Sequence, residues 1–410
     1  MEQTYFRRGF GLKGEIEGAL ATDYHSRVVD RIRGQGYVLS IGELTFKLAQ
    51  EFGFCYGVDR AVEYAYETRT KFPGKHIFLV GEIIHNPHVN TKLRAMGVEF
   101  LHRPDGGEFD FSAVTPQDVV ILPAFGVTVT DFERLRAIGA VLVDTTCGSV
   151  LNVWKRVEAY ARDGFTAIIH GKSYHEETKA TSSQVTKYPE GRYLVVRDMA
   201  EAREVCQYIE GAASRARFLE RFAEEMSPGF DPDRDLVRVG VANQTTMLSN
   251  ESLAIAAELR DAMARRYGAA ALADHFRTFD TICSATQDRQ DAVLKLIAEP
   301  LDVMVVIGGY NSSNTTHLAA ICHEKAPSYH IEDAACIDAT AGTIRFRPVG
   351  AKEEQQRAGW LPPGQVTIGI TAGASTPNNK IGETIERIAA SRGLGLEEVW
   401  AADPGASPRG

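Results

Sequence analysis

Three cysteines of this chain each stand directly before a predicted helical stretch. They are Cys55, Cys147 and Cys283. Each opens a block in which short β-rich runs alternate with amphipathic helical stretches, giving a threefold internal repeat with a period of roughly 100 to 130 residues. Such a period is typical of whole domains, and the alternation predicts parallel sheets covered by helices. We therefore predict an α/β protein built from three pseudo-symmetric small α/β domains.

The predicted domain boundaries follow these cysteines. In chain order we expect an N-terminal extension at residues 1–43, α/β domains at 44–146, 147–282 and 283–390, and a C-terminal tail at 391–410. Two segments rich in charged residues, proline and glycine interrupt the repeat: 212–235, an expected surface insertion in the second domain, and 344–365, an expected second loop of this kind. We expect the extension to be folded or docked, and residues 401–410 to be disordered.

Apolar periodicity predicts the individual elements. The predicted strands are Leu44–Ala49, His76–Val80, Val119–Leu122, Val141–Val143, Ala167–Ile169, Arg192–Val196, Val237–Val241, Asp302–Ile307 and Val366–Ile370. The predicted helices are Val58–Thr70, Asn90–Met96, Val129–Ile138, Val150–Asp163, Ser249–Tyr267, Gln287–Ile297, Thr315–Ala326 and Lys380–Ser391. Functional loops of open parallel sheets gather at the carboxyl ends of the strands, so the three domains could direct their loops to a common centre.

Composition narrows the class of protein. The 410 residues include 54 acidic and 45 basic ones, a net charge of −9, which argues against a broad nucleic-acid surface. No apolar run reaches the ~18 residues of a membrane-spanning helix, and six cysteines do not form the dense framework of a small secreted protein. Acidic residues among the N-terminal arginines argue against an organelle-targeting segment. We therefore expect a cytoplasmic protein that binds neither nucleic acid nor membrane.

The setting of the three repeated cysteines favours metal chemistry. A helix N-terminus lowers the pKa of a thiol, and three converging thiolates need a cation. An iron–sulfur cluster held by three cysteines would keep one iron open for a ligand, which is typical of catalysis. Zinc completed by His85 or His175 is the alternative, although the chain lacks the close cysteine pairs of structural zinc sites. The remaining cysteines are expected to be buried and inert: Cys206, Cys322 and Cys336.

Polar loops in the second domain indicate proton transfer. One loop reads His175-Glu176-Glu177, and the loop after the next strand reads Gln244-Thr245-Thr246. Hydroxyls beside a carboxylate can form a proton relay. The simpler alternative is that Glu176 and Glu177 open a helix, where acidic residues complement the helix dipole.

Polar loops in the third domain indicate an anion site. Asn311-Ser312-Ser313-Asn314 places four hydrogen-bonding side chains at one helix N-terminus, where N-capping needs only one. Ala372-Gly373-Ala374-Ser375 adds small residues that let the backbone approach a ligand, and no nucleotide-binding fingerprint is present. The residues alone therefore favour an iron–sulfur enzyme, with a central site, that acts on a small phosphorylated substrate.

Eight segments of this chain resemble the 4-hydroxy-3-methylbut-2-enyl diphosphate reductase family. They are Gly53-Phe54-Cys55-Tyr56-Gly57-Val58-Asp59-Arg60-Ala61, Glu82-Ile83-Ile84-His85-Asn86, Asp144-Thr145-Thr146-Cys147, His175-Glu176-Glu177, Gln244-Thr245-Thr246, Thr281-Ile282-Cys283, Asn311-Ser312-Ser313-Asn314 and Thr371-Ala372-Gly373-Ala374-Ser375. They occur in the order of the family and span roughly residues 44 to 390. One such segment would be a weak signal, but eight in order are highly specific.

The resemblance implies an iron–sulfur oxidoreductase of the methylerythritol phosphate route to isoprenoids. The family reductively removes the hydroxyl of an allylic diphosphate and forms isopentenyl and dimethylallyl diphosphates. The resemblance implies one [4Fe–4S] cluster per chain on Cys55, Cys147 and Cys283, lying centrally among the three domains, whose open iron binds the substrate hydroxyl. Glu177 would deliver the proton with which the oxygen leaves as water, with Thr245 and His175 in the relay. Ferredoxin or flavodoxin would supply the electrons.

The resemblance also implies which residues bind the substrate. They are His85, His175, Thr245, Ser312, Ser313, Asn314 and Ser375. The chain departs from many members at Phe125, which stands where they carry a histidine and which cannot donate to phosphate. The form Leu122-Pro123-Ala124-Phe125-Gly126 resembles the plant and cyanobacterial branch of the family. The long N-terminal extension and segment 212–235 also depart from the short bacterial form.

Two rival hypotheses come from other classes of protein. The first is an iron–sulfur redox sensor without catalysis, and the second is a structural zinc protein. An acidic chain without a basic helix argues against a sensor that binds DNA. Glu177 and the Asn311–Asn314 loop favour the enzyme, because a sensor needs neither of them.

Overall fold

The computed structural model describes residues 4–104, 107–279 and 281–396. The chain divides into two compact units. The first unit contains Met1–Leu12, Arg60–Ile84 and Asn90–Ser284, and the second contains Lys13–Asp59, His85–Val89 and Ala285–Gly410. Most of the predicted tail at 391–410, including the disorder expected at 401–410, lies outside the described residues.

The first unit holds two sheets, and the first of them has the strand order β1-β7-β6-β4-β5 with every pairing parallel. Its strands are β1 (Tyr5–Phe6), β4 (Ile77–Val80), β5 (Val98–Leu101), β6 (Val119–Leu122) and β7 (Val141–Asp144). The helices that alternate with them along the chain are α3 (Tyr56–Lys71), α4 (Pro87–Ala95) and α5 (Val129–Ile138). β4 and β6 are buried along their whole length, as expected for continuous apolar runs in a parallel sheet.

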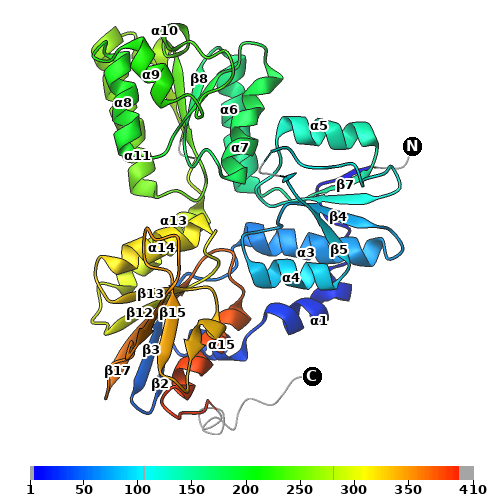
Figure 1. Ribbon diagram of the computed structural model, residues 1–410, viewed down its shortest axis with the longest axis vertical. Helices are drawn as coiled ribbons and strands as arrows, with labels where there is room; N and C mark the ends of the chain where they lie inside the picture. Colours follow the sequence, from blue (N-terminus) through cyan, green and yellow to red (C-terminus); the bar gives the residue numbers. More distant parts are fainter. Residues whose placement is uncertain (1–3, 105–106, 280, 397–410) are drawn as a thin grey trace. The chain divides into compact units, whose positions relative to one another are not determined.

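The second sheet of this unit has the order β11-β10-β8-β9 and is also parallel throughout. Its strands are β8 (Thr166–His170), β9 (Tyr193–Val196), β10 (Val239–Asn243) and β11 (Phe276–Thr278). The helices of this part are α6 (Gly148–Arg162), α7 (Glu176–Ser182), η2 (Ser183–Lys187), α8 (Met199–Ile209), α9 (Arg215–Arg221), α10 (Pro232–Asp235), α11 (Ser249–Tyr267) and α12 (Leu272–His275). Figure 1 shows α8 and α11 side by side, and their apolar faces join one hydrophobic core with this sheet.

The second unit holds the third large sheet, whose order is β13-β12-β17-β3-β2. Its strands are β2 (Val38–Ile41), β3 (Leu44–Leu48), β12 (Val303–Ile307), β13 (Ser328–Ile331) and β17 (Val366–Ala372). All pairings are parallel except the antiparallel hairpin of β2 and β3. The helices of this unit are α1 (Lys13–Tyr24), α2 (Arg27–Gly34), α13 (Ser284–Leu296), α14 (Ser313–His323) and α15 (Asn378–Ala390). The predicted α/β class with parallel sheets is confirmed.

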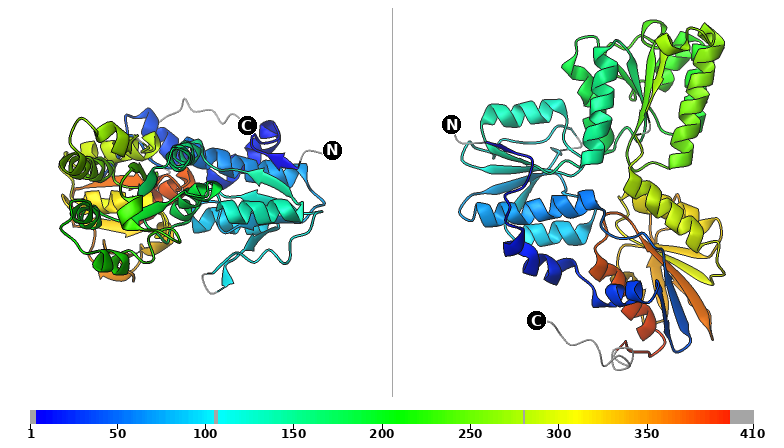
Figure 2. Two further views of the ribbon diagram at one scale, coloured as in Figure 1. Left: turned by 90° about the horizontal axis from the view of Figure 1, so that it is seen from above. Right: turned by 180° about the vertical axis from the view of Figure 1, so that it is seen from behind.

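One strand belongs to a different sheet from the one we expected. We predicted that Leu44–Ala49 opens the first domain, but β3 pairs with β17 in the third sheet. In Figure 1 the blue strand β3 lies beside the orange β17, and Figure 2 shows the same neighbours from behind. Leu44, Phe46 and Leu48 are buried in the core of the second unit. Alternating apolar residues predict a strand but carry no information about its partner.

The segment 212–235 is not the exposed insertion that we expected. It forms α9 and α10, and its three aromatic side chains are buried in the core beside the second sheet; these are Phe218, Phe222 and Phe230. The charged residues that suggested a surface loop lie among these aromatic positions and on both sides of them. A short helix can therefore present charge to water and still contribute a full apolar face to the core.

The segment 344–365 also contains regular structure. β15 (Thr343–Phe346) pairs antiparallel with β14 (Ile337–Asp338) and with β16 (Gln355–Ala358), after the short helix η3 (Ala334–Cys336). Ile344 and Trp360 are buried in the core of the second unit. The prediction of a loop was wrong because these strands are short, and β16 is exposed along its whole length.

The N-terminal extension is folded over its described residues, as predicted. β1 adds a parallel strand to the first sheet, and the hydroxyl of Tyr5 donates to Asp144 Oδ2 at 2.6 Å. The carboxylate of Glu67 accepts from the backbone N–H groups of Phe10 and Leu12. Residues 13–43 instead supply α1, α2 and β2 to the second unit. The extension is therefore an integral part of the fold.

Each predicted strand and helix overlaps an observed element, and the elements that sequence analysis missed are mostly short or exposed. The bounds of α5 and α11 were predicted to the residue. Among the residues that the structure describes, no helix has the length and apolar character needed to span a membrane.

Acid should destabilise the first unit through His170. This side chain, at the end of β8, is fully buried, its Nδ1 lies 2.8 Å from Ser252 Oγ, and burial lowers its pKa from 6.5 to about 4. The folded state therefore binds fewer protons than the unfolded state between these values. The stability contributed by neutral His170 is complete above pH ~6.5 and is lost as the pH falls towards 4. We expect a loss of roughly 2 to 3 kcal/mol between pH 7 and 4.5.

Urea unfolding of the wild type and of His170→Gln at both pH values measures this effect. The variant should show a smaller loss of unfolding free energy on acidification, by the amount given above. His330, which is buried with a similarly low pKa, is present in both proteins and cancels in the comparison. Equal losses in the two proteins would show that His170 is not the titrating group.

Candidate functional site

The three repeated cysteines occupy matching positions in the structure. Cys55 directly precedes α3, Cys147 is the N-cap residue of α6, and Cys283 directly precedes α13. All three are half-buried, and the side chain of Cys147 makes no capping hydrogen bond. Each thiol therefore lies at a helix N-terminus and is partly accessible, a setting that suits a metal ligand.

The other three cysteines are buried, as predicted. Burial raises the pKa of Cys206 and that of Cys322 to about 12, so both remain neutral thiols at physiological pH. This contrast in burial separates the two sets of cysteines. It supports the choice of Cys55, Cys147 and Cys283 as ligands.

The predicted acid and its hydroxyl neighbour lie together in the first unit. Glu177 stands in the first turn of α7, is only 3% exposed, and accepts a hydrogen bond from the backbone N–H of Thr245 at 2.5 Å. Gln244 links their two loops, because its Oε1 accepts from Lys172 N and from the hydroxyl of Thr178, each at 3.1 Å. One carboxyl oxygen of Glu177 is thus held by backbone, and the position of the other is fixed with it.

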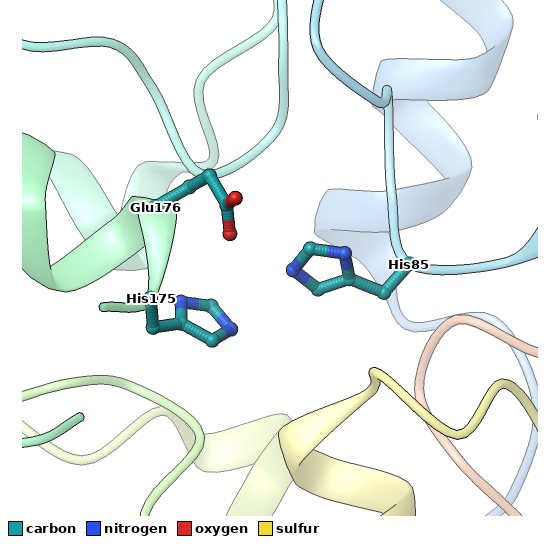
Figure 3. Close-up of side chains that lie close together, drawn as sticks. All are labelled: His85, His175 and Glu176. Carbon is teal, nitrogen blue, oxygen red and sulfur yellow. The ribbon is translucent and has the colours of Figure 1, made fainter. Parts of the chain in front are cut away.

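His175 lies beside this acid as the N-cap residue of α7. Its Nδ1 accepts from the backbone N–H of Glu177 at 3.2 Å, so a neutral ring carries its proton on Nε2. Figure 3 shows His175 and Glu176 at the start of α7, and also His85, which belongs to the second unit. The Nε2–H group makes His175 a suitable donor to an anionic oxygen.

Phe125 and Cys147 lie in the same part of the first unit as His175. The rings of Phe125 and His175 meet edge to face, with centroids 6.3 Å apart and an interplanar angle of 78°. The backbone N–H of Cys147 donates to Ala124 O at 2.8 Å. Phe125 therefore packs against a predicted catalytic side chain and helps to orient it.

The segment before Cys283 is tied to the loop that carries Thr245. The hydroxyl of Thr281 donates to Asn243 Oδ1, and the backbone N–H of Asn243 donates to Thr281 Oγ1 at 3.2 Å. Sequence analysis missed this role of Asn243. The available signal was a polar residue at the carboxyl end of a buried strand, directly before Gln244.

The polar cradle predicted in the third domain is present in the second unit. The hydroxyl of Ser375 lies 3.4 Å from Ser312 Oγ and donates to His85 O at 3.3 Å. The side-chain carbonyl of Asn314 accepts from Ala374 N at 2.9 Å, and Ser312 caps α14. The structure therefore brings His85, Ser312, Asn314 and Ser375 together, with Ser313 in the first turn of α14.

Cys55 lies next to this cradle, and the cradle has an unused donor. The backbone N–H of Cys55 donates to Ala374 O at 3.1 Å. Asn314 is 2% exposed, and its Nδ2 has no hydrogen-bond partner among the residues that the structure describes. A Cβ on Gly373 would lie 1.9 Å from Thr315 Oγ1, so only glycine fits there. A buried amide without an acceptor is costly, which indicates that a ligand supplies the acceptor.

Comparison with known proteins gives the family of this chain. Residues 46–389 match the model of the family described as LytB protein. The chain belongs to the LytB family. It is 51% identical to the "4-hydroxy-3-methylbut-2-enyl diphosphate reductase" of Gloeobacter violaceus over 96% of this chain and 94% of the relative. It is 50% identical to the protein of the same name from Thermosynechococcus vestitus over 96% of each chain.

A solved structure also resembles this one. It is titled "Structure of (E)-4-Hydroxy-3-methyl-but-2-enyl Diphosphate Reductase, the Terminal Enzyme of the Non-Mevalonate Pathway", and it aligns with a TM-score of 0.52 at 27% identity over 85% of this chain and 99% of that one. The two sequence relatives named above are both cyanobacterial. The predicted family and the predicted branch are therefore confirmed.

Proposed function

We propose that this chain is a 4-hydroxy-3-methylbut-2-enyl diphosphate reductase. The reaction adds two electrons and two protons to the allylic diphosphate, releases the hydroxyl as water, and forms isopentenyl and dimethylallyl diphosphates. The observation that carries this proposal is the identity of about half, over nearly the full length of both chains, to relatives of that name. The buried acid and the polar cradle supply the matching site chemistry.

The residues present fit an iron–sulfur cofactor. Thiolates are the ligands that iron–sulfur clusters take, and Cys55, Cys147 and Cys283 combine partial burial with a helix N-terminus. We assign them to one [4Fe–4S] cluster per chain, with one iron lacking a protein ligand. When bound, the cluster supplies electrons one at a time and a Lewis-acidic iron for the hydroxyl.

Glu177 supplies the proton in this proposal. The hydrogen bond from Thr245 N holds Oε1, so the carboxyl group is oriented before substrate arrives and can protonate the departing hydroxyl with its other oxygen. The Nε2–H of His175 and the hydroxyl of Thr245 complete the relay and hold anionic oxygen. The second proton adds at either end of the allylic group, which accounts for two products.

The cradle of the second unit binds the diphosphate in this proposal. The cradle presents hydrogen-bond donors and a helix N-terminus, which suit a phosphate group; its residues are His85, Ser312, Ser313, Asn314 and Ser375. The buried Nδ2 of Asn314 gains an acceptor when a phosphate oxygen is bound.

Asn314→Asp should weaken substrate binding. The carboxylate keeps the oxygen that accepts from Ala374 N, but it replaces the Nδ2 donor by a negative charge next to the diphosphate. Losing a hydrogen bond to a charged group costs about 1.5 to 3 kcal/mol, so we expect KM to rise by a factor of about 10 to 150. Steady-state kinetics with varied substrate measure this change. An unchanged KM would place the diphosphate elsewhere.

Anaerobic dye oxidation tests the function itself. Reconstituted protein is mixed with reduced viologen, and 4-hydroxy-3-methylbut-2-enyl diphosphate is added. Substrate-dependent oxidation of the dye is the expected result. An intact cluster without oxidation would favour the redox sensor, and a colourless protein that carries zinc would favour the structural zinc protein.

The electron donor and the compartment complete the proposal. We assign ferredoxin or flavodoxin as donor, since both transfer single electrons. We assign the cytoplasm as location, because free thiols and an oxygen-labile cluster need a reducing compartment. Either donor, added in reduced form, should replace the dye in the same assay.

A further inference from the structure

Each helix that follows a predicted cluster cysteine carries an arginine that contacts the segment leading to another of these cysteines. The three arginines are Arg60 in α3, Arg156 in α6 and Arg289 in α13. The contacts run in cyclic order, from the first cysteine block to the second, from the second to the third, and from the third to the first. The proposed function assigns no role to these arginines.

Arg60 holds the backbone next to Cys147. Its Nη2 donates to Thr146 O at 2.8 Å, and this carbonyl belongs to the peptide bond that joins Thr146 to Cys147. Asp144 fixes the same residue from within the loop, because its Oδ1 accepts from the backbone N–H of Thr146 at 2.9 Å and from its hydroxyl at 2.5 Å. The backbone of Thr146, directly before Cys147, is thus held at its carbonyl by Arg60 and at its N–H by Asp144.

Arg289 holds the backbone before Cys55. Its side chain is buried, with 4% exposed, and its Nη2 donates to Gly53 O at 2.7 Å while its Nη1 donates to Ala285 O at 2.7 Å. Gly53 has φ +75°, and a Cβ there would lie 2.8 Å from Asn378 Oδ1, so this segment has little freedom. A guanidinium keeps its charge when buried. The positive charge of Arg289 therefore lies against the carbonyl of Gly53, the residue two positions before Cys55.

Arg156 makes the third and weakest contact. Its guanidinium carbon lies 4.0 Å from the centroid of the ring of Phe279, which precedes Cys283 by four residues. Arg156 is exposed, so water and salt screen its charge. Arg60 and Arg289 therefore make the stronger contacts, and Arg156 only completes the pattern.

We propose that Arg60 and Arg289 are positioning residues for the iron–sulfur cluster, which hold the segments of Cys147 and Cys55 and raise the reduction potential of the cluster through their fixed charge. This inference rests on the proposed function. Covalent geometry puts a guanidinium nitrogen of each arginine within roughly 12 Å of a cysteine sulfur. Reduction makes a cluster more negative, and cluster potentials follow the nearby charge and burial, so a buried cation favours the reduced state.

The test compares Arg60→Gln and Arg289→Gln with the matched control Arg238→Gln in the reconstituted full chain. Arg238 also donates to two backbone carbonyls, Asp163 O and Asp274 O, each at 3.0 Å. It precedes β10 and so lies at the opposite end of this strand from the loop that carries Thr245. Iron content, half-life of the cluster under a chelator and midpoint potential are measured, and circular dichroism follows thermal unfolding.

We expect both Gln variants to lose the cluster faster than the wild type and to hold a smaller reduced fraction at a fixed potential. A fall of about tenfold in the ratio of reduced to oxidised cluster corresponds to about 59 mV. Arg238→Gln should lose thermal stability without a change in potential. Arg289→Lys keeps the charge but not the two hydrogen bonds. Its midpoint potential should therefore equal that of the wild type, while its cluster should be lost as fast as in Arg289→Gln.

The outcomes separate this inference from the proposed function. Two results would refute the role of charge. One is a wild-type midpoint potential in both Gln variants. The other is a midpoint potential in Arg289→Lys that is as low as that of Arg289→Gln. A wild-type protein that takes up no iron would refute the proposed function instead. If Arg289→Gln does not fold, Arg60→Gln and Arg289→Lys decide, with a lowered potential expected in the first and a wild-type potential in the second.

Discussion

Glu177→Gln should lower kcat by a factor of about 10² to 10⁴ while the cluster assembles and the substrate binds. The amide oxygen of glutamine can still accept from Thr245 N, so the loop keeps its conformation. The amide has no acidic proton, so the hydroxyl cannot be released as water through this residue. Single-turnover reduction, followed by product analysis, measures the chemical step, and a binding isotherm measures the affinity for substrate.

Glu201→Gln is the matched control for this variant. Glu201 is also a buried acid in the first turn of a helix of the first unit, and its Oε2 accepts from the backbone N–H of Arg197 at 2.7 Å. Its Oε1 accepts from Arg221 at 2.8 Å, so the neutral variant should lose stability but keep kcat. Normal turnover in Glu177→Gln, or an equal fall in both variants, would remove Glu177 from the proton pathway.

Cys147→Ser should abolish both cluster binding and turnover. A serine hydroxyl stays protonated at neutral pH and is a harder ligand than a thiolate, so it holds iron poorly. We expect iron per chain and activity to fall by a factor of about one hundred or more, while the secondary structure is retained because Cys147 is only half-buried. Iron analysis, visible absorbance and circular dichroism together separate loss of the cluster from loss of the fold.

Cys206→Ala provides the comparison for the cysteine variant. Cys206 is buried in the core beside the second sheet, and burial raises its pKa to about 12, so it is not a thiolate at neutral pH. The variant should bind a full complement of iron and turn over normally, with a loss of about 1 kcal/mol in stability. If Cys206→Ala lost its cluster, or if Cys147→Ser kept one, the assignment of ligands would be wrong.

The candidate functional residues form two sets, one within each compact unit. Cys147, His175, Glu177, Thr245 and Cys283 belong to the first unit, and Cys55, His85, Ser312, Asn314 and Ser375 belong to the second. In the proposed function, the first set supplies the proton and the second holds the diphosphate. Each set is organised by contacts within its own unit.

Features of this protein that depend on local chemistry are recognisable from the amino-acid sequence. Three features were predicted from short runs of particular residue types. They are the cysteines that precede helices, the loop of Glu177 and the Ser312–Asn314 loop. The parallel α/β class followed from periodicity for the same reason, since the runs around Ile121 and Val305 are buried whichever strand they pair with.

The contacts between distant segments, by contrast, become known only from the folded chain. Leu44–Leu48 pairs with β17, more than three hundred positions away, and the aromatic residues of 212–235 turn a charged segment into part of a core. Arg60 and Thr146 are separated by 86 positions, and Arg289 and Gly53 by 236. Periodicity records which face of an element is apolar, whereas pairing depends on shape and hydrogen bonds that exist only once the chain has folded.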